Sequence, residues 1–272
     1  MKLLSVRDLS FQRQGYFAYK HVTFSLSQKE SVSITGDSGS GKTALLETLA
    51  GLNYPDSGTA SYTTGARVGF MPQIETEIIN DSVVEHLEKI RQLTGDLAVR
   101  SDQAKDLAAY MGMSPFMDRK VSTLSVGLRQ RVSFLAAVIG RPNILILDDP
   151  FSFQNSTYIT NMLEIVKDLE DNGSGILVAG PMNDSGVDAY FDTNYQMKAK
   201  SLEPKNLADI NLMLVFKITP DSMAITKELG AFVAAELDGV VELKVPAIHK
   251  DAIIKTMIEL NYQFEGMRNL EV

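Results

Sequence analysis

The sequence predicts a layered α/β fold followed by a small second α/β unit, and three patterns support this prediction. Short strand-like runs such as the β-rich 31–35 and the apolar 144–147 alternate with longer helical segments, as in domains built around a parallel sheet. A glycine-rich loop joins the first of these runs to a helix. After about residue 204 the pattern of strands and helices changes, so we expect a domain boundary there.

The first 204 residues contain the elements of a sheet covered by helices. Strands are expected at 3–10, 22–26, 31–35, 68–71, 144–147 and 176–179, and helices at 42–50, 81–93 and 159–171. The run at 144–147 (ILIL) is apolar throughout, which is typical of a strand in the middle of a parallel sheet. Residues 96–140 are expected to be mostly helical, with breaks at Gly112 and Pro115. Residues 81–140 are therefore expected to be mostly helical.

Residues 205–272 are expected to form a small α/β accessory domain. Strands are predicted at 212–219 and 240–245, with helices at 221–237 and 250–260. The last helix carries its apolar residues on one stripe. No cluster of acids, bases or glycines in this part indicates chemistry.

The composition excludes several classes of protein. The chain of 272 residues has 26 basic and 34 acidic side chains, a net charge of -8, so wide contact with a nucleic-acid backbone is not expected. It contains no cysteine, which excludes disulfides and thiolate metal sites. No run approaches the ~20 apolar residues that span a bilayer, and the first residues lack a signal-peptide core. We therefore expect a soluble protein that would need a partner for any role at a membrane.

The strongest motif is a glycine-rich loop at 36–43, between a predicted strand and a predicted helix. It matches G-x-x-x-x-G-K-[ST], a phosphate-binding loop. Its residues, all expected to bind a nucleotide, are Gly36, Asp37, Ser38, Gly39, Ser40, Gly41, Lys42 and Thr43. Backbone N–H groups and the helix N-terminus would face the phosphates. Lys42 would neutralise the β- and γ-phosphates, and the Thr43 hydroxyl would bind Mg²⁺.

A second motif follows the apolar strand at 144–147. Asp148 and Asp149 stand at its C-terminal end, where α/β sheets place their ligands. Asp148 is expected to assist the Mg²⁺ ion that accompanies the phosphates.

Between these motifs lies Leu124-Ser125-Val126-Gly127-Leu128-Arg129-Gln130-Arg131. This segment resembles the LSGGQ signature of the ATP-binding-cassette family, and the LSGGMxQR form of an exporter-like branch. Ser125, Gly127 and Arg131 fit, whereas Val126 and Leu128 depart from the pattern. Gln73 lies where the family has its Q-loop glutamine, and 81–85 resembles the segment that opens the helical subdomain. The resemblance runs from about residue 3 to residue 200.

The resemblance implies a P-loop NTPase core with a mixed sheet, an inserted helical subdomain and a C-terminal extension. It implies an ATP-binding subunit that couples binding and hydrolysis of MgATP to transport by a separate membrane-spanning permease, at the inner face of the cell membrane. Two cassettes would form a dimer, with each ATP between one phosphate loop and the Ser125–Gly127 segment of the other chain. Asp149 and Gln73 would be catalytic, and Thr43, Gln73 and Asp148 would hold the metal.

Some residues depart from the family pattern and leave alternatives open. Asp149 replaces the usual catalytic glutamate, Pro181 the switch histidine, and Asn155 the aspartate of the D-loop. A subunit that binds ATP but hydrolyses it poorly, as a regulator or within a heterodimer, is therefore an alternative. A non-transport family member acting on ribosomes or DNA is disfavoured by the single cassette and the acidic balance.

Two assignments also keep alternatives. The residue that stacks on adenine would be Arg13, whose guanidinium is planar, or Tyr16 or Phe17 if the loop is longer. The segment 240–272 resembles the tail of drug- or polypeptide-exporter ATPases, and the other interpretation is a structural extension.

Overall fold

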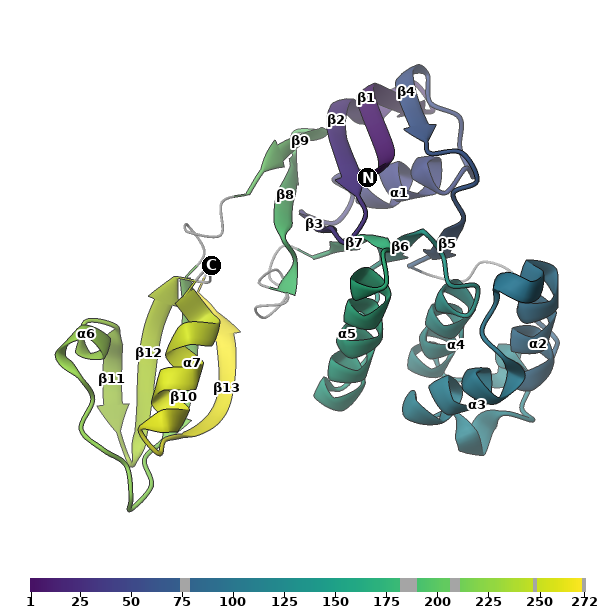
Figure 1. The fold of residues 1–272 in the computed structure, drawn as a ribbon. Coiled ribbons are helices and arrows are strands. Elements are labelled where there is room, and N and C mark those ends of the chain that lie inside the picture. The colour runs from purple at the N-terminus through teal and green to yellow at the C-terminus, as the bar shows by residue number, and fades with distance from the viewer. Residues whose placement is uncertain (74–78, 182–189, 206–210, 247–248, 271–272) are drawn as a thin grey trace. The chain divides into compact units, whose positions relative to one another are not determined.

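The computed structural model describes the chain except for residues 74–78, 182–189, 206–210, 247–248 and 271–272 (Figure 1). It contains two compact units. The first comprises residues 1–181 and 195–203, and the second comprises residues 182–194 and 204–272. The described residues 190–194 thus group with the C-terminal part.

A six-stranded sheet forms the centre of the first unit. Its order is β5 (Val68–Met71), β6 (Ile144–Asp148), β7 (Gly175–Gly180), β3 (Ser31–Thr35), β8 (Thr193–Lys198) and β9 (Ser201–Pro204). The first four of these strands pair in parallel. Every residue of β3 and β6 is buried, as the continuous apolar run at 144–147 predicts for a central parallel strand. The predicted α/β fold is confirmed, and β8 and β9 are additional to the predicted strands.

A second, antiparallel sheet has the order β2 (Tyr16–Ser27), β1 (Lys2–Arg13) and β4 (Ser57–Tyr62). Together with helix α1 (Lys42–Leu49) it encloses the main hydrophobic core, where side chains of β1 and β2 meet those of β3, β6 and β7. Strand β4 was not predicted, because nearly all of its residues are exposed and it lacks alternating apolar positions.

Helices cover the other side of the central sheet. Figure 1 shows α4 (Val126–Val138) and α5 (Ser156–Asp171) on the side opposite α1. Beside α4 lie α2 (Val83–Thr94) and α3 (Ser101–Tyr110), which supply the helices expected at 81–140. Helix α2 begins with a capping box, in which Ser82 and Glu85 each bond the backbone N–H of the other. The expected break near Pro115 is a short 3₁₀ turn at Ser114–Phe116.

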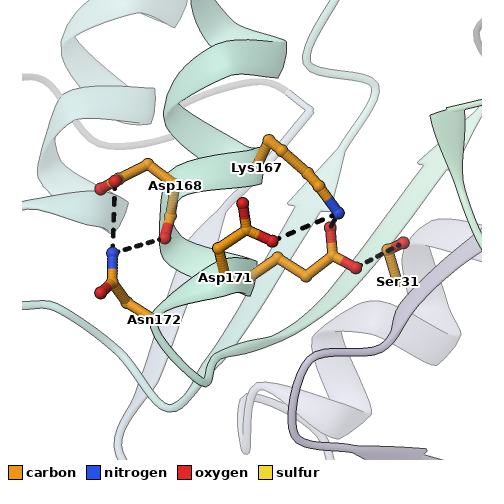
Figure 2. A network of polar contacts seen from close by, with 6 residues as sticks. Ser31, Lys167, Asp168, Asp171 and Asn172 are labelled. Carbon is orange, nitrogen blue, oxygen red and sulfur yellow. Dashed lines mark hydrogen bonds and ion pairs between the residues drawn. The ribbon is translucent and has the colours of Figure 1, made fainter.

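A buried carboxylate ties the end of α5 to the start of β3 (Figure 2). Glu170, only 4% exposed, accepts a hydrogen bond from the Ser31 hydroxyl at 3.3 Å and from the Lys167 ammonium at 3.0 Å. The same ammonium lies 3.4 Å from Asp171. These carboxylates raise the pKa of Lys167, so the lysine remains charged and β3 is held at its first residue.

The second unit is a four-stranded antiparallel sheet with the order β11 (Val233–Leu237), β12 (Val240–Pro246), β10 (Asn211–Lys217) and β13 (Gln263–Asn269). Helix α7 (Lys250–Glu259) contributes Ile253 and Met257 to its core. The connectivity and strand order are those of a split β-α-β arrangement. Within the described residues of the whole chain, no helix is both long and apolar enough to cross a membrane.

The predicted helix at 221–237 is wrong. The structure has only a four-residue helix, α6 (Lys227–Gly230), followed by strand β11. Strands β11 and β12 form a hairpin whose turn residues, Asp238 and Gly239, have φ values of 52° and 77°. An Asp-Gly pair favours such a turn. This local signal and pairing with β12 outweigh the helical propensity of the Ala- and Glu-rich segment.

Candidate functional site

The glycine-rich loop connects the buried strand β3 to α1. Gly41 stands at the N-cap of α1 with φ +114°, and a Cβ on this residue would lie 2.0 Å from the Ala18 carbonyl oxygen. Both the backbone conformation and the close approach of β2 therefore require glycine. This tight connection places the N-terminus of α1 next to the loop, where a helix favours anions.

Lys42 reaches back across the loop. Its ammonium donates hydrogen bonds to the carbonyl oxygens of Gly36 at 2.6 Å and Asp37 at 2.9 Å. Burial lowers the pKa of Lys42, while Asp148, Asp149 and Asp37 act in the opposite direction. The side chain is thus a half-buried cation at the mouth of the loop, in a position to meet phosphate oxygens.

Asp148 ends strand β6 beside the first turn of α1. Its side chain is buried, with 2% exposure for the residue, and burial raises its pKa to about 6. The Thr43 side chain hydrogen-bonds to it, but Oδ2 has no partner among the described residues. Carboxylate and hydroxyl oxygens are ligands that Mg²⁺ accepts, so this pair fits such an ion. The described residues contain no cluster of three or more His, Asp or Glu side chains able to hold a metal, so phosphate and water oxygens would complete a coordination to which Thr43, Asp148 and Gln73 contribute.

Asp149 is oriented through both carboxylate oxygens. The Gln73 amide donates to Oδ2 at 3.2 Å, and the Ser152 hydroxyl donates to Oδ1 at 2.7 Å. The backbone N–H of Asp149 donates to the Ala179 carbonyl oxygen at 2.7 Å, and its φ is +52°. The carboxylate is therefore held in place by side chains from separate segments.

These groups line one cavity of about 600 Å³. The predicted site residues that line it are Arg13, Gly36, Ser38, Gly39, Ser40, Gly41, Lys42, Thr43, Gln73, Asp148 and Asp149. Pro181 also lines the cavity, so the departure from the family pattern falls within the site. The three candidates for stacking on adenine, Arg13, Tyr16 and Phe17, all line it as well, with Tyr16 81% exposed and Phe17 44% exposed.

The predicted residues Asp37, Ser125 and Gly127 do not line this cavity. Ser125 caps α4 by accepting a bond from the Leu128 N–H at 3.4 Å. Gly127 packs closely on the next segment, because an added Cβ would lie 2.6 Å from the Phe153 carbonyl oxygen. Its own carbonyl accepts from the Gln154 amide at 3.0 Å. The segment is thus ordered by contacts outside the cavity.

Three polar side chains that line the cavity were not predicted from the sequence: Glu47, Ser152 and Lys200. Ser152 follows Asp149 by three residues, a spacing at which a hydroxyl in a turn can bond the carboxylate. Glu47 lies on α1, one helical turn after the phosphate loop motif. No pattern in the sequence points to Lys200, which lies far along the chain from the other residues.

The buried Asp148 predicts a specific pH dependence of stability. Its pKa, about 6 in the folded protein, exceeds the ~3.9 of an unfolded Asp. Above pH 6 the charged form therefore destabilises the fold, by roughly 1–3 kcal/mol, and this penalty disappears as the pH falls towards 4. Asp148→Asn is expected to unfold at higher urea than the wild type at pH 7.5, and the difference should shrink at pH 4.5. An equal difference at both pH values would contradict this assignment.

Comparison with known proteins agrees with this site. Residues 19–152 match the family model described as ABC transporter. The chain is 30% identical over 179 residues to the zinc import ATP-binding protein ZnuC of Rhizobium meliloti (strain 1021). This match covers 65% of this chain and 58% of that protein. It is 25% identical over 194 residues to the ergothioneine transport ATP-binding protein EgtV of Helicobacter pylori (strain G27), covering 65% of this chain and 88% of that protein.

The solved dimeric structure of a bacterial ABC transporter cassette has the same fold, with a TM-score of 0.66 at 22% identity over 74% of this chain and 97% of that chain. The match to the zinc import relative spans little more than half of that protein's length. The phosphate loop and Asp148 both lie within the first unit. The six-stranded sheet forms the centre of the same unit. The first unit thus has the fold of ABC transporter ATP-binding cassettes, and its residues 19–152 match the ABC transporter family model.

Proposed function

We propose that the protein is the ATP-binding subunit of a transporter and couples binding and hydrolysis of MgATP to transport by a separate membrane-spanning permease. The observation that carries this proposal is the single cavity into which distant segments bring Lys42, Thr43, Asp148 and Asp149. The names of the zinc and ergothioneine relatives, both ATP-binding proteins of transport systems, support the same role.

Each polar group in the cavity has a role that its surroundings favour. Lys42 and the loop amides would bind the β- and γ-phosphates. Thr43, Asp148 and Gln73 would hold Mg²⁺, which when bound neutralises phosphate charge. Asp149, oriented by Gln73 and Ser152, would orient the attacking water and accept its proton.

The most direct test is phosphate release by the purified chain. We expect ATP-dependent release by the wild type that requires Mg²⁺ and is lost in Asp148→Asn. Failure of the wild type to bind ATP, measured with a fluorescent analogue, would overturn the proposal.

A second cassette is part of the proposal. Ser125 and Gly127 lie outside the cavity that contains the phosphate loop, so the signature segment would act on the nucleotide of another chain. The dimeric state of the related bacterial cassette supports this arrangement. The partner would be a second copy or a homologous subunit.

The absence of cysteine makes the dimer testable by disulfide trapping. Ser38 and Ser125 are both exposed. When a Ser38→Cys chain is mixed with a Ser125→Cys chain and ATP, we expect an oxidised heterodimer on a non-reducing gel, because the two segments would meet across the interface. Neither variant alone should form this product. A disulfide within one chain of the strictly monomeric double variant would contradict the arrangement.

A second cavity is the proposed docking site for a segment of the permease. A cavity of about 520 Å³ lies between β5, α2 and α4 and is lined by apolar side chains that include Phe70, Ile90 and Leu93. Leu93 is 89% exposed, so a partner segment in this cavity would bury apolar surface. A segment of a permease would cover it and bring the protein to the membrane.

The direction of transport is a finer part of the proposal. The exporter-like branch rests on the Leu124–Arg131 segment and on the C-terminal extension, whereas the zinc relative is named as an import protein. A degenerate subunit with slow hydrolysis is favoured by one observation, because Pro181, which has no side-chain donor, lines the cavity. This alternative makes a prediction about turnover.

A further inference from the structure

The turn between β8 and β9 contains two non-glycine residues in a left-handed backbone conformation. Ala199 and Lys200 have φ values of 47° and 69°, a left-handed conformation that glycine adopts readily and other residues adopt at a cost. The turn is attached to β2, because the Lys200 carbonyl accepts a hydrogen bond from the Lys20 N–H at 2.7 Å. The Ser201 hydroxyl also donates to the Lys20 carbonyl at 3.4 Å. The turn is therefore held in one position.

From this position Lys200 reaches the phosphate loop. Its ammonium donates a hydrogen bond to the Gly39 carbonyl oxygen at 2.6 Å, and the side chain lines the same cavity as Lys42 and Thr43. The peptide that joins Gly39 to Ser40 is thus held on both sides, since the Ser40 N–H donates to the Asp37 carbonyl at 3.1 Å. The half-buried lysine supports the outer bend of the loop.

We propose that Lys200 is a second lysine of the nucleotide site, which positions the Gly39–Ser40 peptide and adds positive charge towards the phosphates of the nucleotide. The inference rests on the proposed function of the cavity. Lys42 already makes bonds to the Gly36 and Asp37 carbonyls. The lining also contains the acidic residues Glu47, Asp148 and Asp149, so a further cation improves the electrostatic balance for a polyphosphate.

The backbone conformation strengthens the argument. Glycine at position 200 would relieve the left-handed strain, so a lysine there is not explained by stability of the turn. A positive φ alone does not mark a site, because Lys29 in another turn also has one. At position 200 the contact with the Gly39 carbonyl supplies the reason for a lysine.

The test compares the dissociation constants of ATP and ADP for variants of the full chain. Lys200→Met keeps the length of the side chain but removes its charge, and we expect about tenfold weaker ATP binding. Lys200→Arg keeps the charge and should bind within about threefold of the wild type. Lys200→Gly should also bind more weakly, while its Tm stays equal to that of the wild type or rises by about 1–4 °C. The matched control is Lys198→Met, because Lys198 is exposed and is not among the residues lining the cavity.

The outcomes distinguish the proposed role of Lys200 from the proposed ATP-binding function of the cavity. Weaker binding in Lys200→Met and Lys200→Gly, with unchanged Tm and rescue by Lys200→Arg, supports it. Equal affinity of Lys200→Met and wild type overturns it, as does weak binding that accompanies a lower Tm in every variant, the control included. If the wild type binds ATP in these experiments, the proposed function stands whichever result is obtained for Lys200.

Discussion

The double variant Asp149→Glu, Pro181→His is expected to hydrolyse ATP about 100-fold faster than the wild type, with little change in ATP affinity. A positioned general base contributes roughly 10²–10⁴ in rate. In the wild type, Asp149 is held by Gln73 and Ser152, but it is one methylene shorter than glutamate and reaches less far into the cavity. Pro181 lines the cavity and offers no donor, so developing charge on the γ-phosphate lacks one stabilising contact.

The two substitutions affect different contributions to the rate of hydrolysis, so the single variants separate these contributions. Asp149→Glu should restore reach, and Pro181→His should supply a donor, each raising turnover less than the pair. Ground-state affinity is expected to depend on Lys42, Thr43 and the loop amides, which neither substitution alters. Steady-state phosphate release and ATP titration would be measured on all four proteins. A wild type that already turns over at about 1–10 s⁻¹ would show that these departures are tolerated.

Lys42→Ala is expected to weaken ATP binding by about 10- to 100-fold. The ammonium is half-buried and directed across the phosphate loop by the Gly36 and Asp37 carbonyls. Charge-assisted bonds of this kind contribute roughly 1.5–3 kcal/mol. Titration of a fluorescent ATP analogue gives the dissociation constants directly.

The control for this variant is Lys29→Ala, since Lys29 is exposed and is not among the residues lining the cavity. It removes the same charge from the same unit, so its affinity should stay within about twofold of the wild type, as for surface substitutions away from a site. Equal dissociation constants for Lys42→Ala and the wild type would contradict the assignment of residues 36–43 as a phosphate-binding loop.

The parts of the fold that follow from local sequence were predictable, and the exposed strands were not. β6 contains a continuous apolar run at 144–147, β3 is a short β-rich run, and the loop motif between β3 and α1 has a characteristic spacing. β4 has mostly exposed polar residues, so it lacks the alternation that indicates a strand. The Asp238-Gly239 pair carried a hairpin signal that was overlooked in favour of helical propensity.

The candidate site was predictable where its chemistry is concentrated in short motifs. The loop at 36–43 and Asp148–Asp149 lie at the ends of parallel strands, so the sheet brings them to one edge. Ser152 and Lys200 were not predicted, because their roles depend on a turn and on a hairpin whose turn is hydrogen-bonded to Lys20 of β2. The role of a single polar residue of this kind becomes evident only from its tertiary contacts.

The attachment of Glu170 to Ser31 also determines where the phosphate loop can bend. β3 lies between β7 and β8 in the sheet, all five of its residues are buried, and its first residue is tied to α5. Such a strand exposes its amides to solvent only when the whole sheet opens. We therefore expect any rearrangement of the loop on nucleotide exchange to pivot at Gly36. The amide hydrogens of β3 should exchange slowly without ATP and at least as slowly with it, because a ligand that binds the folded state also disfavours opening of the sheet.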